Sequence, residues 1–311
     1  MKLRHMLGRL RPFLKKYVLK TRAGASLYSA WRERYRDKDT SVRRMRSAWN
    51  RLSRTSRLGF ISHLQTGETW NEREFHIVGI RFVDRIMERF ADYGEVEPSY
   101  GNVLEIGCGV GRFLKPLACR FKDVRGVDIS HEMIKSAKRY CRGMPNISIS
   151  VNDGQSLGEF PDSSFDYCFS AGVFQHITNI EVILNYVREA LRVLRPGGLF
   201  LFQFVGSRTE KVGSGTTGAQ ITALSLDEGL GGVNYLIREV SVDPADPVRN
   251  VVIVIQKPKA GQRVRGADRS FVKYPMTERR WLSGVYDDIT TRTQMHERLK
   301  KGPDRLTFYD K

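Results

Sequence analysis

The chain has 311 residues, of which 41% are hydrophobic, and its formal net charge is +18. This length accommodates one large domain or one domain with substantial extensions, and the absence of any run of 18 apolar residues argues against a membrane span. The four cysteines show no paired metal-type spacing, so the sequence predicts no metal site; they indicate reduced, mostly buried thiols and a cytoplasmic protein, peripheral at a membrane if the basic segments bind one.

The positive charge is concentrated at the two ends of the chain. Residues 1–57 contain 18 Lys and Arg against 3 Asp and Glu, residues 58–207 contain 16 against 18, and residues 208–311 contain 18 against 13. We therefore predict a basic, partly helical N-terminal arm over residues 1–60, a main domain over residues 61–256 and a basic C-terminal extension over residues 257–311.

The arm has the pattern of a basic amphipathic helix, interrupted by Pro12. Its apolar residues recur at helical spacing: Leu3, Met6, Leu7, Leu10, Phe13, Leu14, Tyr17 and Val18. Three interpretations stay open: an arm that packs on its own domain, a segment of residues 1–57 that contacts an anionic membrane surface or an acidic partner, and a targeting segment.

The main domain begins with a helical pattern over residues 70–90, and then alternates between apolar strands and amphipathic helices. Such alternation predicts a doubly wound, mostly parallel α/β sheet of Rossmann-like type, with a helical N-terminal extension and an antiparallel closing strand. The predicted strands are 102–106, 124–128, 147–151, 165–170, 199–204, 233–242 and 250–256; the predicted helices run from the glycine loop to about 121, from Ser130 as N-cap to about 140, from 179 to 194 and from 277 to 300.

Three glycines alternate directly after the first strand, at Gly107, Gly109 and Gly111. A dinucleotide-binding loop needs its third glycine one position later, where the chain has Arg112. The spacing therefore argues against a nicotinamide or flavin dinucleotide.

Carboxylates follow at the ends of the next two strands, where ligands of open α/β sheets bind. Asp128 ends the second strand and is suited to a ribose diol, and Asp153 with Gly154 follows the third and is suited to an adenine amino group. Taken singly, Asp128 is equally explained as a helix-capping acid and Asp153-Gly154 as a turn.

The residues Val103 to Gly111, Phe165 to Ile177 and Leu191 to Gly198 resemble motif I, motif IV and the turn before the fifth strand of class I S-adenosylmethionine-dependent methyltransferases. This resemblance covers about residues 70–206. It implies S-adenosylmethionine as cofactor, and the cofactor-binding residues it implies are Glu105, Gly107, Gly109, Gly111, Asp128, Asp153, Gly154, Ser170 and Phe174.

By the same resemblance, the reaction is in-line transfer of a methyl group, for which the protein positions two partners and excludes water. We expect O-methylation of a small-molecule, saccharide or lipid-linked acceptor. His176 is the candidate base for the acceptor hydroxyl, or alternatively a histidine that only orders the loop.

Two alternatives remain open: an RNA methyltransferase, and a non-catalytic module that binds nucleic acid or protein through the same fold. The stretch Ser170-Ala171-Gly172-Val173 lacks the Asn/Asp-Pro-Pro-aromatic motif of enzymes that methylate base amino groups, and Cys168 does not follow a proline, as carbon-5 enzymes require. Methylation of RNA hydroxyls remains possible, and the oligomeric state is not predicted.

Overall fold

The computed structural model describes residues 37–55, 72–206, 218–221, 226, 229–230, 232–242, 250–259, 261–262 and 272–275. The helices predicted over residues 3–18 and 277–300 lie outside this part of the chain. The proposed three-part division of the chain stays a prediction.

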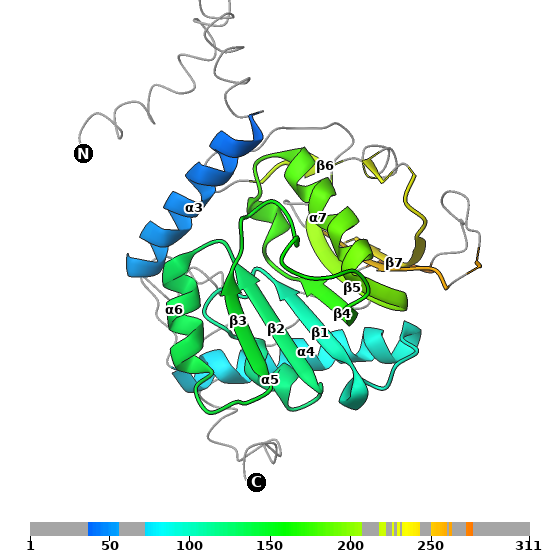
Figure 1. Cartoon of the computed structure of the whole chain (residues 1–311), viewed down its shortest axis with the longest axis horizontal. Helices are drawn as coiled ribbons and strands as arrows, with labels where there is room; N and C mark the ends of the chain where they lie inside the picture. Colours follow the sequence, from blue (N-terminus) through cyan, green and yellow to red (C-terminus); the bar gives the residue numbers. More distant parts are fainter. Residues whose placement is uncertain are drawn as a thin grey trace, which may run out of the picture.

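One mixed sheet runs through the described residues, in the strand order β3-β2-β1-β4-β5-β8-β7-β9, with β6 beside β5 (Figure 1). The pairings from β3 to β5 are parallel, whereas β8 runs antiparallel to both β5 and β7. The doubly wound fold and the closing antiparallel strand are thereby confirmed. The strands are β1 Asn102–Ile106, β2 Asp123–Asp128, β3 Ile147–Val151, β4 Phe165–Ser170, β5 Leu194–Gly206, β6 Gln220–Ile221, β7 Leu236–Val242, β8 Asn250–Gln256 and β9 Val272–Pro275.

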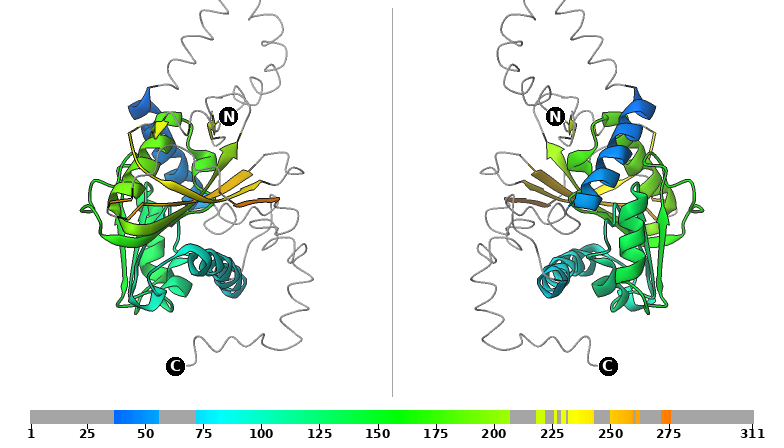
Figure 2. Two further views of the ribbon diagram at one scale, coloured as in Figure 1. Left: turned by 90° about the vertical axis from the view of Figure 1, so that its right-hand side faces the viewer. Right: turned by 90° about the vertical axis from the view of Figure 1, so that its left-hand side faces the viewer.

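Helices cover both faces of this sheet (Figure 2). The core on one face includes residues of α7 Ile180–Val193 and of α3 Lys38–Thr55. The core on the other face includes residues of α4 Glu72–Tyr93, α5 Leu114–Ala118 and α6 His131–Tyr140. Two single turns of 3₁₀ helix, η3 Pro98–Tyr100 and η4 Phe174–His176, complete the described elements. None of the described helices is long and apolar enough to cross a membrane.

Side-chain caps determine where helices α6 and α7 begin. Ser130 accepts a hydrogen bond from the backbone N–H of Met133 at 3.3 Å, as expected for the predicted N-cap of α6. Asn179 accepts from the N–H groups of Glu181 and Val182 at 2.9 and 3.3 Å, which starts α7 directly after η4.

The sequence analysis placed the start of β5 too late and gave no bounds for α3. The strand includes the predicted turn Arg195 to Gly198, because the backbone of this stretch pairs with Lys257 through Gly197 N–H and Gly198 O. Helix α3 lies in the arm that was predicted to be partly helical, but its bounds were not predicted, since its few apolar residues lie in a strongly basic stretch.

Candidate active site

The glycine loop is held in a conformation that favours glycine at each alternate position. Gly107, Gly109 and Gly111 have φ angles of +79°, +54° and +90°, which side chains other than glycine rarely adopt. The carbonyl of Val127 accepts hydrogen bonds from the N–H groups of Gly107 and Cys108 at 2.7 and 2.9 Å, so the loop is folded against the end of β2. A Cβ atom on Gly107 would lie 2.3 Å from the Val173 side chain.

Asp128 at the end of β2 holds this loop from the other side. Its Oδ2 accepts from the Gly109 N–H at 3.0 Å and its Oδ1 from the Ser130 N–H at 2.8 Å. Burial raises the pKa of this carboxyl to about 6, although both N–H groups act in the opposite direction. Asp128 therefore joins the glycine loop to the start of α6, and its carboxylate oxygens keep further lone pairs.

Glu105 is the buried carboxyl of the site, with 3% of its surface exposed. Its Oε2 has no hydrogen-bond partner among the described residues. Burial raises its pKa to about 8, the Asp128 charge adds to this shift, and the Arg112 guanidinium opposes it. A buried carboxyl oxygen without a partner is costly in a folded protein, so its position beside the glycine loop calls for a ligand.

Asp153 and Gly154 form a tight turn after β3. The Asp153 carboxylate is exposed and accepts from the N–H groups of Gln155 and Ser156, both at 2.7 Å, and from the Ser156 hydroxyl. Gly154 has a φ of +84° and donates to the Asn152 side chain at 2.6 Å. The turn explains both residues locally, and the adenine-binding role of Asp153 stays a prediction.

Ser170 and Phe174 have no exposed surface. The Ser170 hydroxyl donates to the Ile106 carbonyl at 3.0 Å, which ties β4 to β1. The Phe174 ring packs against Tyr186, Phe200 and Phe202. In this conformation the Phe174 side chain belongs to the core, so a cofactor contact here would have to come from the backbone.

His176 lies at the end of a side-chain network that sequence reasoning did not identify. The Gly172 N–H donates to Gln203 Oε1 at 3.2 Å, Gln203 Nε2 donates to Gln175 Oε1 at 3.0 Å, and Gln175 Nε2 lies 3.2 Å from His176 Nε2. A backbone N–H only donates, so the chain of bonds assigns every amide orientation and makes His176 Nε2 an acceptor. In the neutral ring, the proton is then on Nδ1.

Helix α3 lies over the carboxyl ends of these strands. Arg46 donates to the Asp153 carbonyl at 2.8 Å, and the Ser130 hydroxyl donates to the Asn50 side chain at 2.7 Å. The Trp49 ring meets the His176 ring edge-on, with centroids 5.3 Å apart. Residues from the basic N-terminal region thus cover the site. The motifs between residues 100 and 206 give no sign of this contribution.

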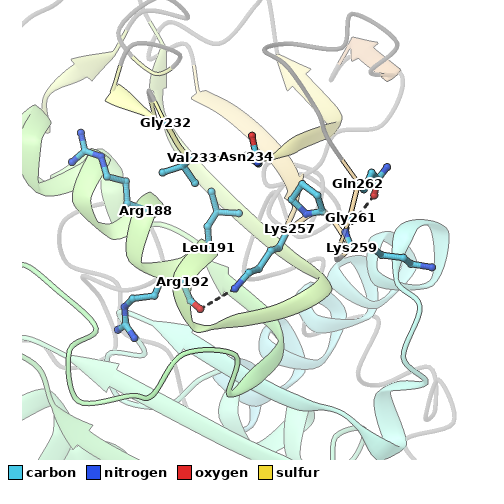
Figure 3. A pocket seen from close by; sticks show the side chains of 11 residues that line it. Arg188, Leu191, Arg192, Gly232, Val233, Asn234, Lys257, Lys259, Gly261 and Gln262 are labelled. Carbon is cyan, nitrogen blue, oxygen red and sulfur yellow. Dashed lines mark hydrogen bonds between the residues drawn. The ribbon is translucent and has the colours of Figure 1, made fainter.

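A separate cavity of about 570 Å³ lies near the opposite ends of the strands, between the end of α7 and the residues after β8 (Figure 3). Its basic residues already have structural partners. Lys257 donates to the carbonyls of Arg192 and Leu194 at the end of α7, and Arg192 pairs with Glu189 and Asp162. No group of three potential metal ligands occurs among the described residues.

Comparison with known proteins agrees with this geometry. Residues 104–202 match the family model described as a methyltransferase domain. The chain is 34% identical over 110 residues to malonyl-[acyl-carrier protein] O-methyltransferase 2 of Ilyobacter polytropus, an alignment that covers 35% of this chain and 40% of the relative. It is 24% identical over 233 residues to the ubiquinone biosynthesis O-methyltransferase of Mesorhizobium japonicum, which covers 71% of this chain and 87% of that protein.

Among solved structures, phosphoethanolamine N-methyltransferase 1 of Haemonchus contortus has the same fold, with a TM-score of 0.57 at 14% identity over 86% of this chain and 57% of that chain. The chain spans 40% and 38% of the length of the first two curated relatives. The matched domain, the glycine loop and the strand order agree with one another. Residues 104–202 form a methyltransferase domain similar to those of the class I S-adenosylmethionine-dependent methyltransferases.

Proposed function

We propose that the protein transfers a methyl group from S-adenosylmethionine to a hydroxyl group of a small-molecule, saccharide or lipid-linked acceptor. The observation that carries this proposal is the buried carboxyl of Glu105, whose Oε2 has no partner among the described residues, at the mouth of the left-handed glycine loop. Such a pair of features suits a ligand that brings a cationic amino group and needs close backbone approach.

The residues present fit this donor. Glu105 is the candidate partner for its α-amino group, and the loop from Gly107 to Gly111 for its methionine part. Asp128 is the candidate acceptor for its ribose hydroxyls, since a carboxylate already bound by two N–H groups still has lone pairs to accept with. The turn at Asp153 and Gly154 is the candidate contact for its adenine.

When bound, S-adenosylmethionine supplies a methyl group that is already activated by a sulfonium centre. The protein's own contribution is then to position the acceptor and to exclude water. Helix α3 suits the second task, because Trp49 and Arg46 extend the cover from His176 to the Asp153 turn.

Of the two roles considered for His176, the network supports ordering of the loop. Its Nε2 lone pair is engaged by Gln175, so a proton-accepting His176 would first have to break that bond. His176→Gln keeps an oxygen for this bond and removes the imidazole, and we expect it to retain most of kcat. A large loss of kcat, together with loss of the acidic limb of the pH profile, would instead identify His176 as the base.

The acceptor class is inferred from two sources. The stretch after β4, Ser170-Ala171-Gly172-Val173, lacks the motifs of enzymes that methylate nucleobases. The names of two relatives refer to O-methylation, and one of them, the ubiquinone biosynthesis O-methyltransferase of Mesorhizobium japonicum, refers to a quinone as well. We therefore favour a lipid-linked or small organic hydroxyl over RNA.

Two experiments test the proposal. Calorimetric titration with S-adenosylmethionine should show saturable binding, weakened about tenfold or more in Asp128→Ala, because hydrogen bonds to charged groups contribute about 1.5–3 kcal/mol. Asp123→Ala, at the far end of β2, is the matched control and should bind normally. Saturable binding that ignores Asp128, or no binding, would contradict the proposal.

The acceptor is found by incubating the protein and an isotopically labelled donor with a fractionated cell extract, followed by mass spectrometry. We expect label in small-molecule or lipid fractions, lost in Asp128→Ala. Label confined to RNA would support the RNA methyltransferase alternative instead.

A further inference from the structure

The outer face of α3 is strongly basic. Arg43, Arg51 and Arg54 are exposed, and with Arg44 they fall within about 100° of the helix circumference. The inner face, which includes Val42 and Met45, is buried against the domain. The cations therefore point outward as a strip rather than surrounding the helix.

Helix α6 lies beside α3 and continues the strip. The two helices are joined by the Arg54–Glu132 ion pair at 3.0 Å and by the bond from Ser130 to Asn50. They form the left edge of the molecule in Figure 1 and face the viewer together in the right-hand view of Figure 2. The exposed residues Lys135, Lys138 and Arg139 lie one turn apart on the outer side of α6.

We call this surface the α3–α6 basic face: Arg43, Arg44, Arg51, Arg54, Lys135, Lys138 and Arg139. Its seven cations stand against three nearby carboxylates, Asp37, Asp39 and Glu132. Residues 58–207, by contrast, carry 16 Lys and Arg against 18 Asp and Glu, so the excess of positive charge on this face is not a property of the domain as a whole. A surface of this kind attracts a polyanion, and its field is strongest at short range.

We propose that the α3–α6 basic face seats the protein on an anionic phospholipid bilayer. Two observations favour lipid headgroups over RNA. The segment that precedes α3 in the chain has apolar residues at helical spacing between its cations, a pattern suited to the membrane interface. The basic face itself presents Arg and Lys without an exposed aromatic side chain, which single-stranded nucleic acid would use for stacking.

This placement brings the bilayer close to the site, because the inner side of α3 contacts His176 and the Asp153 turn. A bilayer-bound protein would then meet a lipid-linked acceptor without releasing it to water. This last step rests on the proposed function, whereas membrane binding itself does not.

The test measures partitioning of the full chain onto vesicles of phosphatidylcholine alone and of phosphatidylcholine with phosphatidylglycerol. We expect binding only to the anionic vesicles, and weaker binding at higher salt. Each cation near such a surface contributes about fivefold to the partition coefficient, so Lys135→Gln/Lys138→Gln should weaken binding roughly 25-fold. This pair lies on α6, outside residues 1–60, so it tests the α6 part of the basic face separately from the N-terminal arm.

Two controls keep the comparison matched. Lys135→Arg/Lys138→Arg preserves the charge and should partition within about twofold of wild type. Lys259→Gln removes one exposed cation at the opposite end of the sheet and should have less than a twofold effect. Circular dichroism and the thermal unfolding midpoint of each variant show that the domain is folded.

Unchanged partitioning of the Lys135→Gln/Lys138→Gln variant would overturn the proposal of a joint α3–α6 face, because residues 1–60 would then account for binding without α6. Failure of wild type to bind anionic vesicles, with charge-dependent binding to RNA, would overturn it as well. Vesicle binding by a protein that does not bind the methyl donor would support the basic face and contradict the proposed function.

Discussion

Replacing Glu105 by Gln should separate the stability of the fold from its affinity for the methyl donor. The side chain is buried, and its pKa is raised to about 8 from an ordinary value of 4.5. Between these two values the folded protein binds a proton that the unfolded chain releases. The resulting stability is fully present below pH 4.5 and is lost as the pH rises through 8.

The magnitude follows from the shift of the pKa. Each pH unit between the two values changes the free energy of unfolding by about 1.4 kcal/mol, so Glu105 lowers stability by about 3 kcal/mol at pH 7 relative to pH 4. Glu105→Gln cannot ionise and removes this slope. Burial of the introduced amide in place of the carboxyl changes the free energy of unfolding by the same amount at every pH. The quantity to compare is therefore the slope of this free energy against pH in the two proteins.

Urea unfolding at pH 5, 7 and 8.5 measures this difference. We expect the advantage of Glu105→Gln over wild type to grow by about 2–3 kcal/mol from pH 5 to pH 7. Glu97→Gln, which removes an exposed carboxyl, should follow the wild-type curve. Parallel curves for wild type and Glu105→Gln would refute the reasoning.

The same carboxyl should release a proton when the donor binds. At pH 7 a group with a pKa of about 8 is roughly nine-tenths protonated, and a cationic partner favours its ionised form. Calorimetry of wild type in two buffers with different ionisation enthalpies should therefore show release of nearly one proton. Glu105→Gln should bind the donor about 100-fold more weakly, as expected when a buried charge pair loses one partner. Equal proton release by both proteins would assign the proton to another group.

Three further substitutions test the glycine loop, the cap of α7 and the buried ion pair between α4 and β7. Gly107→Ala should abolish donor binding and destabilise the fold by several kcal/mol, because the new Cβ atom would lie 2.3 Å from the Val173 side chain. Gly143 has a similar φ angle of +88°, but a Cβ atom there would have no neighbour within 4 Å, so Gly143→Ala should cost only about 1 kcal/mol in thermal unfolding. Asn179→Ala should cost about 1 kcal/mol by loss of the α7 cap, and an unchanged Tm would contradict that role. Arg89→Met should cost about 3–5 kcal/mol, because buried Glu239 would lose its cationic partner at 3.2 Å and keep, among the described residues, only the hydroxyls of Ser241 and Tyr93; denaturant unfolding should show part of this loss restored by adding Glu239→Gln.

Much of the sheet could be predicted because each strand has a local signal. The strands at 102–106, 147–151 and 165–170 have the bounds that the apolar runs predicted, and Ser130 caps α6 as expected. The mostly parallel pairing of these strands was also predicted, because strands that alternate with helices are joined by crossover connections. The predicted family depended on the same local signals.

The remainder depends on contacts between residues far apart in the chain. Gln203 and Gln175 fix the tautomer of His176 across 28 residues, and no pattern of spacing marks either glutamine as part of the site. Helix α3 is stabilised by burial of Val42 and Met45 against a sheet that begins more than 50 residues later. The basic composition of α3 suggested an arm. Its short apolar stripe can be identified only when the sheet face on which it packs is known.

Glu105 and α3 also explain why this site depends on its ligand. A carboxyl that lowers stability near neutral pH regains that free energy when a cationic group binds it, so the donor should raise Tm by more than its contacts elsewhere would suggest. Helix α3 is held to the domain by hydrogen bonds at Asp153, Ser130 and Gln155, by the Arg54–Glu132 ion pair and by a small apolar stripe. A donor bound beneath it would add contacts to this helix. Protection of the α3 amides from hydrogen exchange should therefore increase on donor binding in wild type, and much less in Glu105→Gln.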